Sequence, residues 1–501
     1  MTAHFDPPAA AADLTAPADQ RALLWIIAAL AALWTIVPAL VHLAPPLDVV
    51  ESAMWGREWV VGTYKHPGIP AWFIEMGRVL NGGVTGWPVY LTSQLFTVAT
   101  LGLTYLLARD LAGHQVATAA VISLLGVEYF SWRAPEFNHT QAQMPFWIGA
   151  ALCAWRAVDR QKLVWWLGLG AMAALGLYAK LSNAVLLLVI ARWLLSKGRN
   201  RATLRTAGPW IGALTFAVLC VPLVRWLLAS NFQALSYAGS RGQDQSLIAT
   251  LLFPANTALQ ALPIVLTLAL AGVFRRGAPA MATLTPLRPD ARRYLLVIAL
   301  APPLLSVVLA LIGRSGLRAS WMAPALPLLA VLLLVQFRER LGHDVMRRLL
   351  HIGAALAVLI PLSYALIAPQ VGRFGALPPL RTGWPQAQIA SRLAAAWTAE
   401  TRKPLRIVAG SAWAAGLVGI DHPDRPSILT DGTLAFAPWI TPERLSREGA
   451  LIVWTEGRGG GSTPDLLALA QGLAVHEMRV PVPRSKTMTG IVVRYAILPP
   501  R

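Results

Sequence analysis

The sequence predicts an all-α polytopic membrane protein with about eleven transmembrane helices, followed by a soluble C-terminal α/β domain. The first observation is composition: 56% of the 501 residues are hydrophobic and 13% are charged, whereas charged residues make up about a quarter of a soluble globular protein. The second is a series of apolar runs of membrane-crossing length. The third is a change of composition after residue 368, where these runs stop.

The apolar runs are each roughly 17 to 24 residues long, which suits a hydrocarbon layer about 30 Å thick. A polar N-terminal tail, residues 1–20, precedes them, and together they form a membrane body over residues 21–368. Because the links at 132–141 and at 180 are short, a re-entrant hairpin between 115 and 196 is an open alternative. The expected spans are 21–44, 86–108, 115–131, 142–158, 163–179, 181–196, 208–228, 249–273, 294–312, 321–336 and 349–368.

The distribution of Lys and Arg predicts the orientation. Basic residues concentrate in alternate interhelical loops, at 156–162, 197–205, 275–293 and 338–348. By the positive-inside rule these loops and the N-terminus are cytoplasmic, and an odd number of crossings places the C-terminal domain outside. The net charge of +19 therefore follows from topology, and no nucleic-acid partner is expected.

Residues 369–501 are expected to fold as a separate domain on the outer face. Short β-branched strings at 405–409, 450–454 and 490–495 predict strands, and helices are expected near 385–400 and 463–473. The alternation predicts a small α/β unit.

The first outer loop, residues 45–85, carries the most informative polar residues. Asp48 and Glu51 are spaced i,i+3, which places both carboxylates on one side of a new helix. One interpretation is a capping box, with Asp48 as N-cap and Glu51 binding backbone amides. The other is a pair of active-site carboxylates, and spacing does not distinguish them. Lys65 and His66 follow in a turn, ahead of an apolar stripe that predicts a helix lying in the membrane interface.

A second outer cluster follows the third expected span and includes Glu136, Asn138 and Gln141. It is richer in polar residues than a turn requires. Because carbohydrate hydroxyls need amide and carboxylate partners, the cluster suggests a sugar-binding surface. A solvated loop is the alternative.

Five outer cations break the positive-inside trend: Lys65, Lys180, Arg241, Arg314 and Arg318. An ionisable residue such as Lys180, in an otherwise apolar hairpin, is costly without a partner. Arg suits a phosphate because its fork donates parallel hydrogen bonds, although snorkelling to headgroups is the alternative for each arginine. A bound anion would explain the whole set.

Several strings together resemble the bacterial family 39 glycosyltransferases, which share a superfamily with protein O-mannosyltransferases and the aminoarabinose transferases of lipid A. They are Asp48-x-x-Glu51, YKHPGIPAW, YFSWRAPEFNHTQAQMPFW and GLYAKLSNAVLLL. The resemblance covers roughly residues 20 to 370. Many members have HPP where this chain has His66-Pro67-Gly68, a departure that leaves the turn intact.

The resemblance implies a GT-C fold in the bacterial inner membrane, with a periplasmic active site and a polyprenyl-phosphate-linked sugar as donor. It assigns the catalytic base to Asp48, with Glu51 as its companion, in a displacement that inverts the anomeric centre. The acceptor would be a lipid, a glycan or a protein, with membrane lipids around the body. The cations Lys65, Arg318, Arg241 and Lys180 would bind the donor phosphate, and His66, Glu136, Asn138 and Gln141 the sugar or the acceptor.

No cofactor is assigned. A divalent cation could bind near Asp48, Glu51 and His66, but their spacing is not that of a metal site, so no metal ligand is predicted. Two alternatives to an enzyme remain: a transporter or flippase for lipid-linked sugars, and a non-enzymatic envelope assembly protein.

Overall fold

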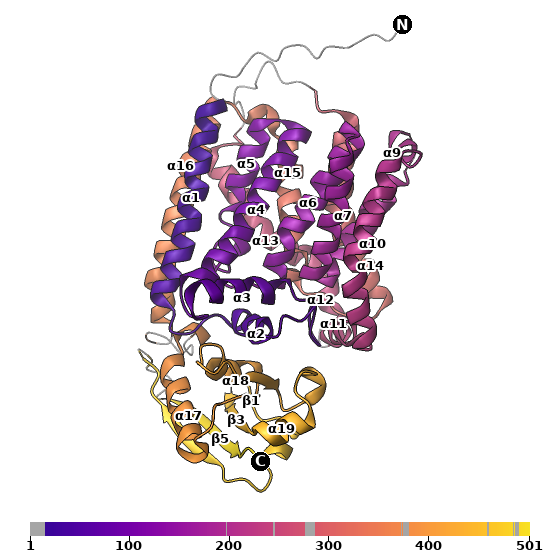
Figure 1. Ribbon diagram of the computed structural model, residues 1–501. Helices are drawn as coiled ribbons and strands as arrows, with labels where there is room; N and C mark the ends of the chain where they lie inside the picture. The colour runs from indigo at the N-terminus through magenta and orange to yellow at the C-terminus, as the bar shows by residue number, and fades with distance from the viewer. Residues whose placement is uncertain are drawn as a thin grey trace.

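The computed structural model describes residues 16–196, 198–243, 246–275, 286–371, 373, 380–457, 460–483, 485 and 490–501. A bundle of long helices forms one end of the molecule, and a smaller domain with a β-sheet forms the other (Figure 1). Most of the predicted tail, residues 1–15, lies outside the described residues, and the first helix begins at Ala16, ahead of the expected residue 21.

Each expected span contains one helix. The six that are long and apolar enough to cross a membrane lie in α1, α4, α10, α13, α14 and α16. The shorter apolar helices include α5, α7 and α8, and the segment that ends with α15. The number of crossings therefore stays a prediction. The bounds are α1 (Ala16–Val41), α4 (Trp87–Ala112), α5 (His114–Leu124), α6 (His139–Arg160), α7 (Leu163–Ala179), α8 (Ala184–Leu194), α10 (Ala207–Ala229), α13 (Phe253–Ala271), α14 (Pro289–Ile312), α15 (Leu326–Gln336) and α16 (His343–Ile367).

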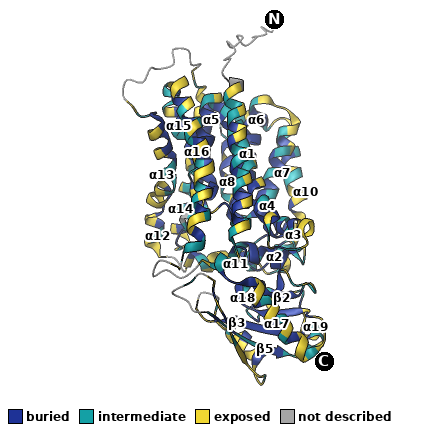
Figure 2. Ribbon diagram, turned by 90° about the vertical axis from the view of Figure 1, so that its left-hand side faces the viewer, coloured by how far each residue is buried: buried dark blue, intermediate teal, exposed yellow. Residues whose placement is uncertain are grey.

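The outer faces of the bundle carry large apolar side chains. Trp25, Leu40 and Leu270 are 76%, 78% and 69% exposed, and exposed residues run along the helices in Figure 2. A soluble monomer rarely exposes so much contiguous apolar surface, whereas lipid covers it without cost. The helical body is that of a multi-pass membrane protein, as the sequence predicts.

Short helices cover the two ends of the bundle. At the end near the small domain, α2 (Leu47–Gly56) and α3 (Ile69–Asn81) of the first loop lie across the bundle, close to α11 (Gln233–Gln243) and α12 (Leu247–Leu251) (Figure 1). A helix is therefore present where the apolar stripe predicts one, as α3, and its position in the membrane interface stays a prediction. The opposite end carries α9 (Arg199–Thr203). The short 3-10 turns are η1 (Glu128–Phe130), η2 (Leu181–Asn183), η3 (Ala319–Ala325), η4 (Arg338–Arg340) and η5 (Ala368–Gln370).

The C-terminal domain contains a five-stranded sheet with the order β2-β1-β3-β5-β4. β1 pairs in parallel with β2 and β3, and β5 pairs antiparallel with β3 and β4. The three predicted strands correspond to β1, β3 and β5, and the two predicted helices to α17 and α20. The bounds are η6 (Arg381–Gly383), α17 (Gln386–Thr401), β1 (Ile407–Gly410), α18 (Ala412–Gly419), β2 (Ser427–Thr430), η7 (Leu434–Phe436), α19 (Pro442–Glu448), β3 (Ala450–Thr455), α20 (Pro464–Ala470), β4 (His476–Val480) and β5 (Ile491–Leu498).

The C-terminal domain packs directly on the first loop. A Cβ added to Gly416 of α18 would lie 2.3 Å from Cγ1 of Val50 in α2, so only glycine allows this approach. Val49 and Trp55 of α2 share one buried hydrophobic cluster with Val408 of β1. The first loop and the domain thus form a continuous core. The boundary between residues 368 and 369 stays a prediction.

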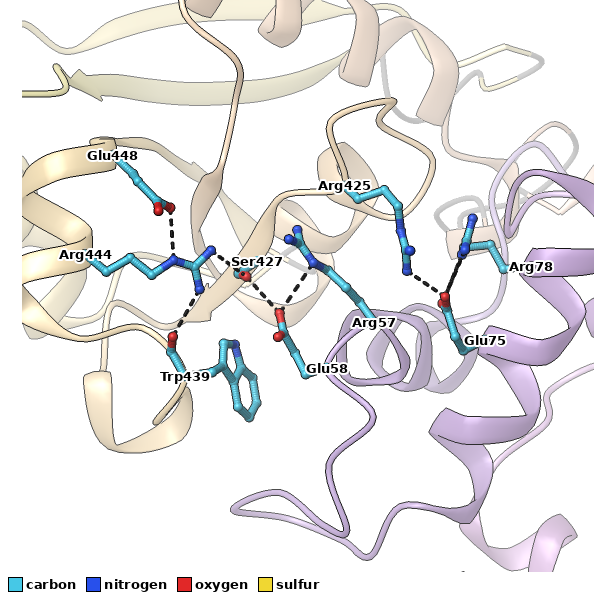
Figure 3. Close-up of polar contacts among 9 residues, drawn as sticks. All are labelled: Arg57, Glu58, Glu75, Arg78, Arg425, Ser427, Trp439, Arg444 and Glu448. Atoms are coloured by element: carbon cyan, nitrogen blue, oxygen red, sulfur yellow. Dashed lines mark hydrogen bonds and ion pairs between the residues drawn. The ribbon is translucent and has the colours of Figure 1, made fainter.

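Polar contacts reinforce this packing (Figure 3). The Arg425 guanidinium donates to Glu75 Oε1 at 2.6 Å, although Glu75 is only 2% exposed. Ser427 Oγ donates to Glu58 Oε1 at 2.8 Å and accepts from Arg444 Nη2 at 3.1 Å. Arg78, which lies in the same helix as Glu75, also pairs with it, so Arg425 joins the domain to an ion pair already present in the first loop.

Candidate active site

Helix α2 places Asp48 and Glu51 on one side of its first turns. The N-cap residue is Pro46, which has no side chain able to cap, and no side-chain hydrogen bond caps this helix. The capping-box interpretation is therefore wrong: the helix begins at Leu47, which puts Asp48 inside its first turn. Both carboxylates are left for other partners.

Glu51 pairs with Lys65. Lys65 Nζ lies 2.5 Å from Glu51 Oε1, and the two side chains are 16% and 14% exposed. Burial lowers the pKa of the Lys65 ammonium, but Glu51, Tyr64 and Tyr237 together outweigh burial, and the net shift is upward. The ammonium also lies 5.5 Å and 5.7 Å from the ring centroids of Tyr64 and Tyr237. Lys65 is therefore a firmly held cation in a largely closed pocket.

Among the described residues, no cation lies at bonding distance from the Asp48 carboxylate. The Asp48 carboxyl is hydrogen-bonded by the Asn138 side chain, and the Asp48 backbone N–H donates to Glu136. Burial, followed by the nearby charges of Glu136 and Glu51, raises the pKa of the Asp48 carboxyl to about 7. A carboxyl with such a pKa is suited to accept a proton near neutral pH.

Asn138 is fixed by the start of α6. Its side-chain oxygen accepts from the backbone N–H groups of Thr140 and Gln141 at 2.9 and 3.0 Å, as an N-cap. These two bonds use the side-chain oxygen, so the amide hydrogens of Asn138 are left to donate to the Asp48 carboxyl. The same residue therefore starts a helix and orients the candidate base.

Lys180 enters the site from the helical body, in the break between α7 and η2. Its ammonium donates to Thr140 Oγ1 at 2.9 Å. Burial lowers the pKa of this ammonium to about 8, although the Asp48 charge acts in the opposite direction. Its hydrogen-bond partner among the described residues is a neutral hydroxyl, so the charge of Lys180 is less satisfied than that of Lys65.

His66 stacks on His139, with ring centroids 4.0 Å apart. Burial, then the neighbouring His139 and the two lysines, holds the pKa of His66 well below its usual value, so the ring is neutral. His139 was not among the predicted site residues. Its Nε2 is buried without a hydrogen-bond partner in the described part of the chain.

The other predicted residues are placed differently. Gln141 points to α4, where its amide donates to Thr97 Oγ1 at 2.6 Å. Arg241 lies over the Tyr237 ring, 6.0 Å from its centroid, and so borders the Lys65 pocket. Arg318 precedes η3 and is partly buried. Among the described residues, it makes no hydrogen bond or ion pair with Asp48, Glu51 or Glu136.

Tyr237 contacts Tyr64, Lys65 and His66, although the sequence prediction did not include it. Its ring lies 6.1 Å from that of Tyr64 and 5.9 Å from that of His66. The available signal was its i,i+4 spacing from Arg241, which places both on one face of α11.

The described residues contain no group of three or more His, Cys, Asp or Glu that could hold a metal ion. Glu51 forms an ion pair with Lys65, and the His66 ring stacks on the His139 ring. The arrangement instead places one weakly acidic carboxyl between amide, histidine and lysine side chains.

A family model described as dolichyl-phosphate-mannose-protein mannosyltransferase matches residues 65–226. The resemblance to glycosyltransferases of the GT-C superfamily is confirmed. The matched segment contains Lys65, His66, Glu136, Asn138 and Lys180, which the fold gathers around Asp48. No curated protein matches the chain.

Similar solved structures come from Archaeoglobus fulgidus. Its oligosaccharyltransferase in complex with Zn and sulfate is 10% identical at a TM-score of 0.42, over 92% of this chain and 72% of that one. The apo form is 12% identical at the same TM-score, over 82% and 64%. The enzyme AglB in complex with an inhibitory peptide and a dolichol-phosphate is 11% identical at 0.42, also over 82% and 64%.

Proposed function

We propose that this chain is a membrane glycosyltransferase that transfers a sugar from a polyprenyl-phosphate donor to an acceptor hydroxyl, with inversion and with Asp48 as the base. The carrying observation is the environment of Asp48, a carboxyl beside two other carboxylates, with no cation of the described part of the chain at bonding distance. Such a group is expensive to keep as a structural element. It suits proton transfer, and the matched family supplies the reaction class.

The proposed step forms one bond and breaks one. The acceptor oxygen attacks the anomeric carbon as its proton passes to Asp48, and the bond from that carbon to the phosphate oxygen breaks. Asn138 holds the carboxyl in place. Attack opposite the departing phosphate inverts the anomeric centre.

The leaving polyprenyl phosphate gains negative charge, and a fixed cation close to it lowers the barrier. Lys180 is the stronger candidate for this role, because its hydrogen-bond partner is a neutral hydroxyl. Lys65 would first have to loosen its bond to Glu51. Arg241, at the border of the Lys65 pocket, and Arg318 would contribute at longer range.

The basic loops place the N-terminus in the cytoplasm under this proposal, so the site and the C-terminal domain face the periplasm of a bacterial inner membrane. The polyprenyl chain would lie against the apolar helix faces while the phosphosugar reaches Lys180.

The test is mass spectrometry of envelope lipids and glycans from a deletion strain. Loss of one glycosyl mass, restored by the wild-type gene but not by Asp48→Asn, is expected. Asp344→Asn is the matched control, because that carboxylate is 72% exposed at the far end of the molecule. Restoration by Asp48→Asn, or an unchanged envelope in the deletion strain, contradicts the proposal.

A further inference from the structure

A small cavity lies between the first loop and the C-terminal domain. Its volume is about 20 Å³, which is room for roughly one water-sized group. Side chains of α2 and α3 line one side, and residues between 419 and 428 of the domain line the other. The charged residues among them are Arg57, Arg78, Arg425 and Glu75. Among the described lining residues, positive charges therefore outnumber negative ones.

The carboxylates beside the cavity do not balance its arginines. Glu75 Oε1 is shared, since it accepts from Arg78 Nη2 at 2.9 Å and from Arg425 Nη2 at 2.6 Å. Glu58 Oε1 lies 3.6 Å from Arg57 Nε, which is longer than a hydrogen bond. Two carboxylates thus serve three guanidinium groups, and Arg57 has the weaker contact.

Arg57 also has an unsatisfied nitrogen. Its Nη1 is buried and has no hydrogen-bond partner among the described residues. Burial lowers the pKa of this guanidinium, and although the Glu58 charge raises it, nearby arginines lower it further. These arginines are Arg425, Arg444 and Arg406. Figure 3 shows Arg57 between the Arg444 and Arg425 side chains. Because a buried N–H without a partner is costly, an acceptor from outside the chain is expected here.

An anion fits this place better than water does. A water molecule would accept a hydrogen bond from Arg57 Nη1 but would leave the excess positive charge of the cavity wall unchanged. An oxyanion would accept the same bond and would reduce the repulsion among the guanidinium groups. Arginine forks suit phosphate oxygens because they donate parallel hydrogen bonds. Since Arg425 is 41% exposed, the cavity can be reached from outside.

Exposed apolar side chains lie next to this cavity on α3. Val79 and Leu80, which directly follow Arg78, are 61% and 79% exposed. In a membrane protein such side chains mark a surface that lipid covers. The phosphate group of a lipid headgroup and a free phosphate present the same chemistry to the three arginines, and experiment distinguishes the two sources.

We propose that the cavity lined by Arg57, Arg78 and Arg425 binds a phosphate group, and that the bound group joins the first loop to the C-terminal domain. One phosphate oxygen enters the cavity and accepts from Arg57. The other oxygens stay at the mouth of the cavity, beside Arg425. This inference goes beyond the proposed transferase activity and does not depend on it.

The first experiment measures binding of radiolabelled inorganic phosphate by equilibrium dialysis, with full-length protein purified in detergent. Arg57→Gln and Arg425→Gln are each expected to lower the affinity about tenfold or more, because each removes a charged hydrogen-bond donor. Arg57→Lys keeps the positive charge without the fork and should lose less. The matched control is Arg347→Gln, which removes an arginine that is 64% exposed at the far end of the molecule and should bind as wild type does.

The second experiment is native mass spectrometry of the same proteins with added phosphatidylglycerol. Retention of this lipid that depends on Arg57 and Arg425, with weak binding of free phosphate, assigns the site to a lipid headgroup, and the reverse result assigns it to free phosphate. Either result supports the inference. Wild-type protein that binds neither probe, or binding that is equally strong in Arg57→Gln and Arg425→Gln, overturns it. If Arg57→Gln does not fold, as judged by its melting temperature, Arg57→Lys takes its place in this comparison.

Discussion

Two largely buried carboxylates at opposite ends of the bundle have opposite surroundings. Asp110, at the end of α4, accepts from Arg156 Nε at 2.6 Å and from Arg160 Nη2 at 3.0 Å. Asp48 instead has two carboxylates, Glu136 and Glu51, as its strongest charged neighbours, with a weaker effect of Lys65, and an amide as its hydrogen-bond partner. The first carboxylate is neutralised and joins α4 to α6. The second is kept unsatisfied, which is how a reactive group differs from a structural one.

The largest expected effect is on catalysis at Asp48. Asp48→Asn keeps the size of the side chain and removes the base, so the transfer rate should fall about 10²- to 10⁴-fold. Thermal stability in detergent should be unchanged or higher, because like charges are relieved. A variant that retains its transfer rate would show that Asp48 has no role as a base.

The reverse is expected at Asp110. Asp110→Asn leaves Arg156, which is 6% exposed, without its carboxylate, and removal of one partner of a buried pair costs about 3–5 kcal/mol. The yield and the melting temperature of the purified protein should fall, while the transfer rate per folded molecule stays near that of wild type. Equal stability of the two variants would erase the distinction between the two sites.

A smaller effect is expected at Lys180. Lys180→Met should lower kcat about 10- to 100-fold, because the leaving phosphate loses a nearby cation, while Lys180→Arg should retain part of the rate. Both variants are assayed at saturating donor. A change confined to KM would instead place Lys180 in uniform donor binding.

The smallest effect is a shift in pH dependence. Deprotonated Asp48 is the active form, so the rate should rise with pH and level off above the pKa of about 7. Glu136 raises that pKa through its charge, so Glu136→Gln should move the rising limb to lower pH. If the rise in rate moves to higher pH or does not move in Glu136→Gln, the charge of Glu136 does not raise the pKa of Asp48.

The sequence predicts the residues of the first loop and several distant residues of this site, such as Asn138 and Lys180, but not all of the distant ones. Asp48, Glu51, Lys65 and His66 belong to one loop, and the chain itself brings them near each other. Tyr237 comes from a segment far along the chain, and only the packing of α11 brings it to Lys65. Sequence spacing carries no information about that packing.

The fold was predicted in the same uneven way. Apolar length located each helix of the body, whereas β2 was missed because it has only four residues and β4 because it is a mostly exposed strand at the sheet edge. The capping-box hypothesis failed because the N-cap position is occupied by Pro46 and because Glu51 forms an ion pair with Lys65. Gln141 was expected at the site by its polarity, but it lies in the first turn of α6 and its amide donates to Thr97.

The most direct test of the central claim is to measure the ionisation of Asp48. Infrared difference spectroscopy of the purified protein between pH 5 and 9 monitors it. We expect a protonated-carboxyl band that disappears with a midpoint near pH 7, that is absent in Asp48→Asn and that persists in Asp110→Asn. A carboxyl spectrum that is the same in wild type and Asp48→Asn over this range would contradict the account.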